Sequence, residues 1–172
     1  MSEAQPSIRD TDAIRTENAR IGYQAAVDLW TYEGEQVWNR SNVMLVANSI
    51  VVAVIGLVIT SQRPVPVLTV VLPITGLILC AVWFLLMKRG FDYSVYYVLS
   101  ARELKEQYLA DPVKTVSRGG DFASGKVVTL EIGGASITRR MSIWSRLLRA
   151  ERASYIVIIV FAVLYTATLF QT

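Results

Sequence analysis

The sequence predicts an all-α membrane protein: a helical hairpin whose long helices extend into the cytoplasm, followed by a third, C-terminal span. Hydrophobic residues make up 53% of the 172-residue chain, and its mean hydropathy is +0.41. Both values are too apolar for an ordinary soluble domain. Three segments also lack any Asp, Glu, Lys or Arg. Each is close to the roughly 20 apolar residues that a helix needs to cross a membrane.

The spans are expected at residues 43–60, 65–87 and 153–170. The polar link at 61–64 is too short for anything but an antiparallel hairpin between the first two. A helix of a soluble protein normally keeps one polar stripe, and residues 50–59 of the first span have none. Voltage sensors, proton relays and most ion-coupled transporters place ionisable residues inside the membrane. The sequence therefore argues against these functions.

Positive charge predicts the orientation. Four Lys and Arg residues precede the first span, one (Arg63) lies in the link, and twelve lie in residues 88–152. Positively charged loops stay on the cytoplasmic side. The N-terminus and residues 88–152 are therefore predicted to be cytoplasmic and the C-terminus extracytoplasmic, in a multi-pass protein of the cell inner membrane.

Two amphipathic helices are expected next to the hairpin. After a disordered tail at residues 1–10, residues 11–42 are predicted to form a helix that runs into the first span, with Gly34 as a place for a kink. Residues 88–110 should extend the second span inward. Each helix has an apolar stripe, and the simplest expectation is that the two stripes pack against each other. The stripes consist of Ile14, Ile21, Ala25, Leu29 and Tyr32, and of Phe91, Val95, Val98, Leu99, Arg102 and Tyr108.

Residues 111–152 form a basic cytoplasmic segment. Residues 112–125, with Gly119 and Gly120 as turn signals, are predicted to be a loop. The alternation in 126–138, around a Gly133-Gly134 pair, is compatible with a short β-hairpin. Residues 139–152 are predicted to be a basic amphipathic helix along the inner membrane surface. Topology alone explains the positive charge, so nucleic acid is not expected as a partner.

Nothing in the sequence indicates an enzyme. The chain has no histidine, which removes the commonest general base and metal ligand. The single cysteine, Cys80, lies in an apolar run and is interpreted as a core residue. No phosphate-binding loop, nucleophile elbow or metal-ligand spacing occurs. We therefore predict no catalytic residue, no cofactor and no metal.

A distinctive polar cluster lies where the first helix enters the membrane. Trp38, Arg40 and Asn42 are compatible with an interfacial belt against lipid headgroups. The alternative is a structural cluster in which Arg40 pairs with Glu33, Glu35 or a carboxylate of another subunit. Within one straight helix these two glutamates are poor partners, because they lie seven and five residues from Arg40.

Deeper in the first span, Asn48 needs a cross-helix hydrogen-bond partner. Small residues along the same helix let another helix approach closely, either within the hairpin or between subunits. Trp83, Tyr155 and Tyr165 are read either as interfacial anchors or as packing residues. The residues predicted to be structural or to lie at an interface are Trp38, Arg40, Asn42, Asn48, Ser49, Ala53 and Gly56.

The run Tyr32-x5-Trp38-x-Arg40-x-Asn42, before a two-span hairpin, resembles the RipA-like octameric membrane proteins of bacteria. It is also similar to the two-span SLATT-type proteins of bacterial conflict systems. The similarity covers about residues 15–110, and the third span departs from the two-span pattern. The first resemblance implies a homo-oligomer in the bacterial inner membrane. The second implies a membrane-perturbing effector or pore.

These observations predict a non-enzymatic homo-oligomeric membrane protein that acts as a scaffold or a gated pore. Residues 1–42 carry four positive and seven negative charges, and residues 88–152 carry twelve positive and seven negative. These opposite net charges on one side of the membrane would steer subunits together. The alternative is a membrane-anchored adaptor that recruits a cytoplasmic protein through residues 111–152. The expected partners are further copies of the chain, membrane lipid and such a cytoplasmic protein.

Overall fold

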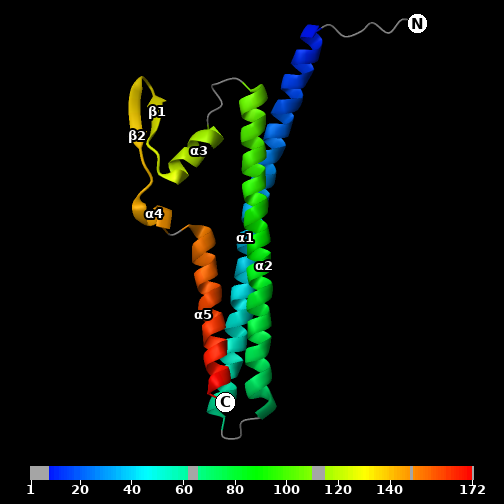
Figure 1. Cartoon of the computed structure of the whole chain (residues 1–172), viewed down its shortest axis with the longest axis vertical. Helices are drawn as coiled ribbons and strands as arrows, with labels where there is room; N and C mark the ends of the chain where they lie inside the picture. The colour runs from blue at the N-terminus through cyan, green and yellow to red at the C-terminus, as the bar shows by residue number, and fades with distance from the viewer. Residues whose placement is uncertain (1–7, 62–65, 110–114, 148, 172) are drawn as a thin grey trace, which may run out of the picture. The chain divides into compact units, whose positions relative to one another are not determined.

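The computed structural model describes residues 8–61, 66–109, 115–147 and 149–171 (Figure 1). Three of its helices are long and apolar enough to cross a membrane, which confirms the predicted all-α membrane fold. The elements are α1 (Ile8–Thr60), α2 (Pro66–Tyr108), α3 (Thr115–Ser124), β1 (Val128–Ile132), β2 (Ala135–Arg139), α4 (Ile143–Leu147) and α5 (Ala150–Phe170).

The two longest helices continue well beyond the lengths that a membrane requires. Helix α1 has 53 residues and passes through Gly34 as helix, and α2 has 43 residues. Because α1 begins at Ile8, it includes residues 8–10, which the sequence had assigned to a tail; residues 1–7 lie outside the described residues. A buried proline, Pro73, lies inside α2, where it removes one backbone hydrogen bond.

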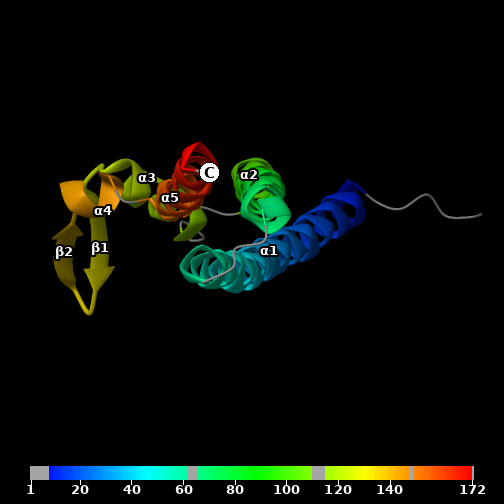
Figure 2. The ribbon, with the colours of Figure 1, turned by 90° about the horizontal axis from the view of Figure 1, so that it is seen from below.

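The chain divides into two compact units. We call residues 33–92 and 148–172 the spanning unit, and residues 1–32 and 93–147 the polar unit. In the spanning unit, parts of α1 and α2 lie beside α5 (Figures 1 and 2). Its core consists of Val37, Ile55, Cys80, Trp83, Met87, Ile158 and Tyr165.

Aromatic contacts fix the direction of α5 in the spanning unit. Tyr155 packs against Phe84 and Phe91, with ring centroids 5.2 and 6.3 Å apart. Tyr165, two to three turns later, lies against Gly76, which comes earlier in α2. Helix α5 therefore runs antiparallel to α2 and in the same direction as α1. Trp83 and Tyr165 are both buried, so they are packing residues and not interfacial anchors.

In the polar unit, α1 and α2 pack through small side chains. Ala19, Ala26 and Ala101 are buried, and a Cβ built on Gly22 would lie 3.2 Å from Leu104 Cδ1. Small residues let two helix axes approach closely. At the far end of this contact the Arg15 guanidinium donates to the Tyr108 hydroxyl at 3.3 Å and lies 4.8 Å from the centre of its ring.

This packing corrects one prediction. The α1 stripe of Ile14, Ile21, Leu29 and Tyr32 was expected to pack on α2, but all four side chains are exposed, as is Ala25. The residues of the predicted α2 stripe differ in their exposure. Phe91, Val98, Arg102 and Tyr108 are half-buried, whereas Val95 and Leu99 are exposed. The apolar stripe of α1 is thus not the face through which α1 packs against α2.

Residues 115–124 are helical, so the predicted loop at 112–125 is wrong over this range; residues 110–114 lie outside the described residues. Gly119 and Gly120 lie inside α3, where a Cβ on Gly120 would collide with the Arg102 guanidinium. Gly125 (φ +85°) ends the helix. Its N–H donates to the Phe122 carbonyl and that of Lys126 to the Asp121 carbonyl, both at 2.9 Å. This pair of bonds is a Schellman motif.

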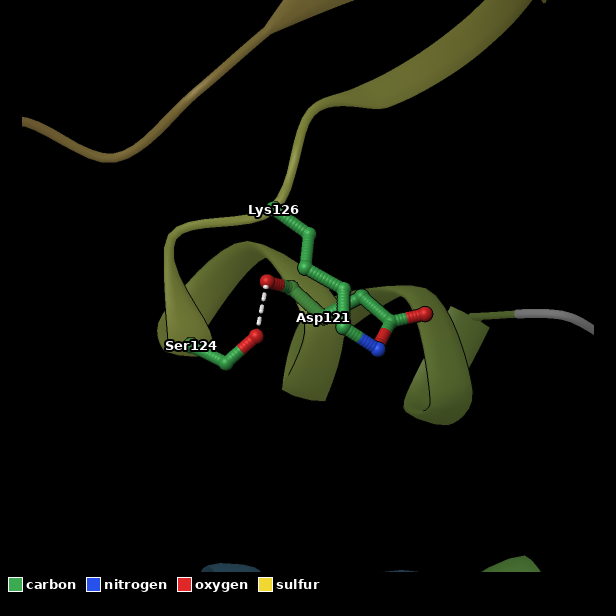
Figure 3. A network of polar contacts seen from close by, with 3 residues as sticks. All are labelled: Asp121, Ser124 and Lys126. Carbon is green, nitrogen blue, oxygen red and sulfur yellow. Dashed lines mark hydrogen bonds and ion pairs between the residues drawn. The ribbon is translucent and has the colours of Figure 1, made fainter.

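A small polar network connects the end of α3 to Lys126, two residues after the helix ends (Figure 3). Lys126 Nζ donates to Asp121 Oδ1 at 2.8 Å, and Ser124 Oγ donates to the Asp121 carbonyl at 2.7 Å. The hydrogen bond and the charge of Lys126 hold the pKa of the Asp121 carboxyl below its ordinary value. Because both side chains are largely exposed, water screens this pair.

The short β-hairpin suggested by the sequence is present. Strands β1 and β2 pair antiparallel, from Val128 opposite Arg139 to Ile132 opposite Ala135. The turn is made by Gly133 and Gly134, whose φ angles are +59° and +81°. Positive φ at both central residues belongs to a type I′ turn, which matches the twist of the strands.

The predicted helix over 139–152 is wrong in extent. Arg139 ends β2, the helical turns of α4 cover only Ile143–Leu147, and α5 begins at Ala150. Ser142 explains the start of α4, since its Oγ accepts the Ser145 backbone N–H at 3.2 Å as a helix cap.

Candidate functional site

A buried polar junction of α1, α2 and α5 lies around Asn48 in the spanning unit. The side chain of Asn48 is fully buried and that of Tyr165 is 1% exposed. The Tyr165 hydroxyl lies 3.0 Å from both the side-chain Oδ1 and the backbone carbonyl of Asn48, so its single proton is shared between two acceptors. Asn48 Nδ2 donates to the Met44 carbonyl at 2.8 Å. The amide therefore has a partner for both its oxygen and its nitrogen.

Helix α2 completes this junction with two small residues. Cys80 Sγ donates weakly to Asn48 Oδ1 at 3.5 Å. At Gly76, one turn earlier, a Cβ would collide with the Tyr165 ring. The absent side chain of Gly76 is thus the space that the ring occupies. Inside a bilayer such a polar group is stable only when it is hydrogen-bonded, so the junction fixes how the three helices pack.

Arg40 lies at a second contact, nearer the charged end of the spanning unit. Its Nη1 is 3.6 Å from Glu33 Oε2, an oxygen that is buried. The seven-residue spacing that argued against this pair is two helical turns on one face, and the long arginine side chain covers that distance. A Cβ on Gly90 would collide with Val37 Cγ2 and lie 3.8 Å from Arg40 Nη1. The glycine therefore permits a close approach of α2 to α1.

The remaining predicted residues lie on a different face of α1. Trp38, Asn42, Ser49, Ala53 and Gly56 recur at four, seven, four and three residues and are all exposed. A Cβ on Gly56 would meet no atom within 4 Å. We call Asn42, Ser49, Ala53 and Gly56 the small-residue face; Trp38 lies at its end. None of these side chains is buried against α2 or α5, and their contact with another subunit stays a prediction.

A groove of about 200 Å³ lies beside this face. Trp83, whose indole Nε1 is buried without a hydrogen-bond partner, forms part of its wall. The groove is lined by Trp38, Ser41, Asn42, Leu45, Trp83, Ala153, Ser154 and Val157.

Sequence reasoning missed the partner of Asn48. Tyr165 was read as an anchor or a packing residue, Cys80 only as a core residue, and Gly76 and Gly90 were not singled out. The available signal was a tyrosine inside an uncharged span, where its hydroxyl must find an acceptor. Which acceptor it finds depends on how the three helices pack.

The described part of the chain contains no group of three or more Cys, Asp or Glu residues that could hold a metal ion. The junction itself offers an amide, a phenol and a thiol, each with a hydrogen-bond partner inside the spanning unit. The fold and the site together define a multi-pass helical membrane protein stabilised by a buried polar junction.

The chain belongs to the octameric membrane protein family (8xMP), whose model matches residues 22–172. The match confirms the resemblance to the RipA-like class and shows that the third span is part of the family pattern. It also supports self-association of the chain in the membrane. No curated protein and no solved structure matches the chain significantly. The resemblance to the SLATT-type proteins stays a prediction.

Proposed function

We propose that this chain is the subunit of a non-enzymatic octameric scaffold in the bacterial inner membrane. The observation that carries the proposal is the apolar surface left exposed in the polar unit. Ile14, Ile21, Leu29 and Tyr32 are exposed on α1, and Val95, Tyr96 and Leu99 on α2. Charged residues interrupt both segments, so lipid does not solvate them. Contiguous apolar surface in contact with water marks a protein interface.

These surfaces explain how a ring would form. They are two different faces on two different helices, whereas a two-fold dimer needs only one self-complementary face. A closed ring of more than two copies joins unlike faces, head to tail. The α1 stripe of one copy therefore docks on the α2 stripe of the next.

Within the spanning unit, the small-residue face of α1 is the surface that we propose for contact with a neighbouring subunit inside the membrane. Ser49, Ala53 and Gly56 allow a neighbouring helix to approach closely, which is how helices associate in lipid. Asn42 adds an exposed amide at the end of this face. In this proposal Trp38, Asn42, Ser49, Ala53 and Gly56 contact the next subunit. Asn48 and Arg40 act within the subunit, where they hold the helices that present this face.

The hydroxyl groups of the spans favour a scaffold over a permanent channel. Ser49, Thr60 and Thr75 each donate to a carbonyl of their own helix at 2.8 to 2.9 Å. Thr166 and Thr168 do the same at 2.8 Å. Asn48, the most polar side chain in a span, is buried against Tyr165. The described spans thus leave few polar groups to line an aqueous pore, and a gated pore would need a rearrangement.

The proposed orientation keeps the polar unit in the cytoplasm and the C-terminus outside. Positive charge supports the first part. The direction of α5 supports the second, because α5 runs the same way as α1, which leaves the cytoplasm in this scheme. The adaptor alternative relies on residues 111–152, and the exposed Ile143 and Trp144 of α4 are its best support.

Disulfide trapping tests the head-to-tail contact. In a Cys80→Ala background, Ile21→Cys and Leu99→Cys variants are made separately, purified in lipid and oxidised alone or after co-expression. The proposal predicts cross-linked dimers in the co-expressed sample, well above the level of either variant alone. Glu131→Cys, an exposed position on β1, is the matched control and should not link to either. Linking of Ile21→Cys only to itself would contradict the head-to-tail arrangement.

A further inference from the structure

Helix α4 has an apolar surface that the described structure leaves uncovered. Ile143 is 76% exposed, Trp144 75% and Leu147 55%. Helical spacing places the three side chains within an arc of about 100°. Such a cluster of large side chains is rarely left in water.

The polar contacts of α4 and the residues before it show why this surface points outward. Arg140 Nε donates to the Gly125 carbonyl at 3.0 Å. The Arg146 guanidinium packs so closely on Gly125 that a Cβ there would collide with it. Both arginines therefore bind the turn at the end of α3. With its polar side held inside the polar unit, α4 presents its apolar side to the surroundings.

The sequence of α4 and its flanks is basic. From Arg139 to Ala150 the sequence contains four arginines and no acidic residue. Two of these, Arg140 and Arg146, contact the Gly125 turn, and Arg139 is exposed at the end of β2. An exposed apolar surface in a basic segment, with Arg139 and Arg149 exposed, is complementary to a bilayer surface that carries anionic headgroups.

The covalent chain keeps α4 near the membrane. Helix α5, which is long and apolar enough to span, begins at Ala150, six residues after Trp144. Even a fully extended chain of that length covers only about 20 Å. Tryptophan at this distance from a span is commonly found at headgroup depth.

We propose that α4 is an interfacial anchor that inserts Ile143, Trp144 and Leu147 into the anionic leaflet from which α5 enters. Arg139 contributes a charge that interacts with lipid phosphate. The occupant of this surface is lipid, so it is not available to a cytoplasmic protein as the adaptor alternative requires. The inference rests on the membrane location of α5 and not on the proposed octamer, so either can fail without the other.

An environment-sensitive fluorophore tests this anchor in the full chain. Ile143→Cys in a Cys80→Ala background is labelled with a nitrobenzoxadiazole (NBD) probe and reconstituted in nanodiscs. The discs contain either zwitterionic lipid or a mixture with phosphatidylglycerol. The proposal predicts emission at shorter wavelength than in water and several-fold stronger quenching by spin-labelled lipid than by an aqueous quencher. Glu17→Cys, far upstream of the first span in the sequence, is the control and should show the reverse.

Each outcome decides the proposal. Stronger lipid quenching in the anionic discs, reduced by Arg139→Gln, supports it. A probe shielded from both quenchers means that protein covers α4, either a second copy or a partner, and overturns it. A probe quenched mainly from water also overturns it. Should the Ile143→Cys chain fail to fold, Leu147→Cys on the same face gives a second reading.

Discussion

The hydroxyl of Tyr165 and the side-chain oxygen of Asn48 lie 3.0 Å apart inside the spanning unit, although 117 residues separate them in the sequence. This contact joins the third span to the first. Cys80 adds a weaker contact from the second span. The three spans thus share one buried polar point, which apolar packing alone would not specify.

A double-mutant cycle measures this contact. Tyr165→Phe and Asn48→Ala should each lower the free energy of unfolding in a detergent titration. Interhelical hydrogen bonds in membranes contribute roughly 0.6 to 2 kcal/mol. The double variant should lose less than the sum of the two single losses, because the same bond is broken only once. Fully additive losses would mean that the two side chains act independently.

Gly76 provides a steric test of the same junction. Gly76→Ala places a methyl group where the Tyr165 ring lies, and overpacking of this kind costs about 1 to 3 kcal/mol. Gly34→Ala in α1 is the matched control, since a Cβ there meets no atom within 4 Å of the same chain and Gly34 is not part of the proposed subunit contact. Unfolding of the two variants by detergent should therefore differ clearly. Equal stability would show that the ring does not occupy this space.

The sequence predicted the spans and the long helices well, because uninterrupted apolar runs and the absence of breakers are local properties. It could not choose the packing face in the polar unit. The apolar stripe of Ile14 and Ile21 is more conspicuous than the Ala19, Gly22 and Ala26 face that α2 contacts. Helix α2 packs on the face with small side chains because the two helices can approach each other more closely there. This distance depends on both helices and cannot be read from the sequence of one.

The α3 region shows a second limit. Gly119 and Gly120 are turn signals in isolation, yet both lie inside α3, and the missing side chain of Gly120 leaves room for the Arg102 guanidinium. Helix α3 instead ends just before Gly125, whose positive φ is incompatible with a continued helix. For the candidate site, the pattern correctly selected Asn48 as a residue that needs a partner. It could not supply Tyr165, because the pairing depends on the tertiary arrangement of the spans.

Arg40 tests whether its ion pair has a structural role. Removing the guanidinium leaves the buried Oε2 of Glu33 without its cation. Arg40→Ala should therefore reduce the amount of folded protein that accumulates in the membrane. Glu33→Gln together with Arg40→Ala should recover part of that loss, since no unpaired carboxylate remains. Membrane fractions quantified by immunoblot provide the readout. Normal accumulation of Arg40→Ala with loss of a cellular activity would instead identify a functional site.

Topology is tested with reporters that are active on one side of the membrane only. A reporter inserted in the Gly133–Gly134 turn should behave as cytoplasmic, because that turn is exposed and lies in the basic segment. One fused after Thr172 should behave as extracytoplasmic. A cytoplasmic signal from the Thr172 fusion would mean that α5 does not cross the membrane.

The central claim is that the chain assembles with copies of itself, and the mass of the purified complex in mild detergent or nanodiscs tests it most directly. Mass photometry should give a single species of eight subunits at 19.2 kDa each, in addition to bound detergent or lipid. Gly56→Ile, which places a bulky side chain on the exposed small-residue face, should shift the complex toward smaller species. A wild-type complex with the mass of one subunit would contradict the account.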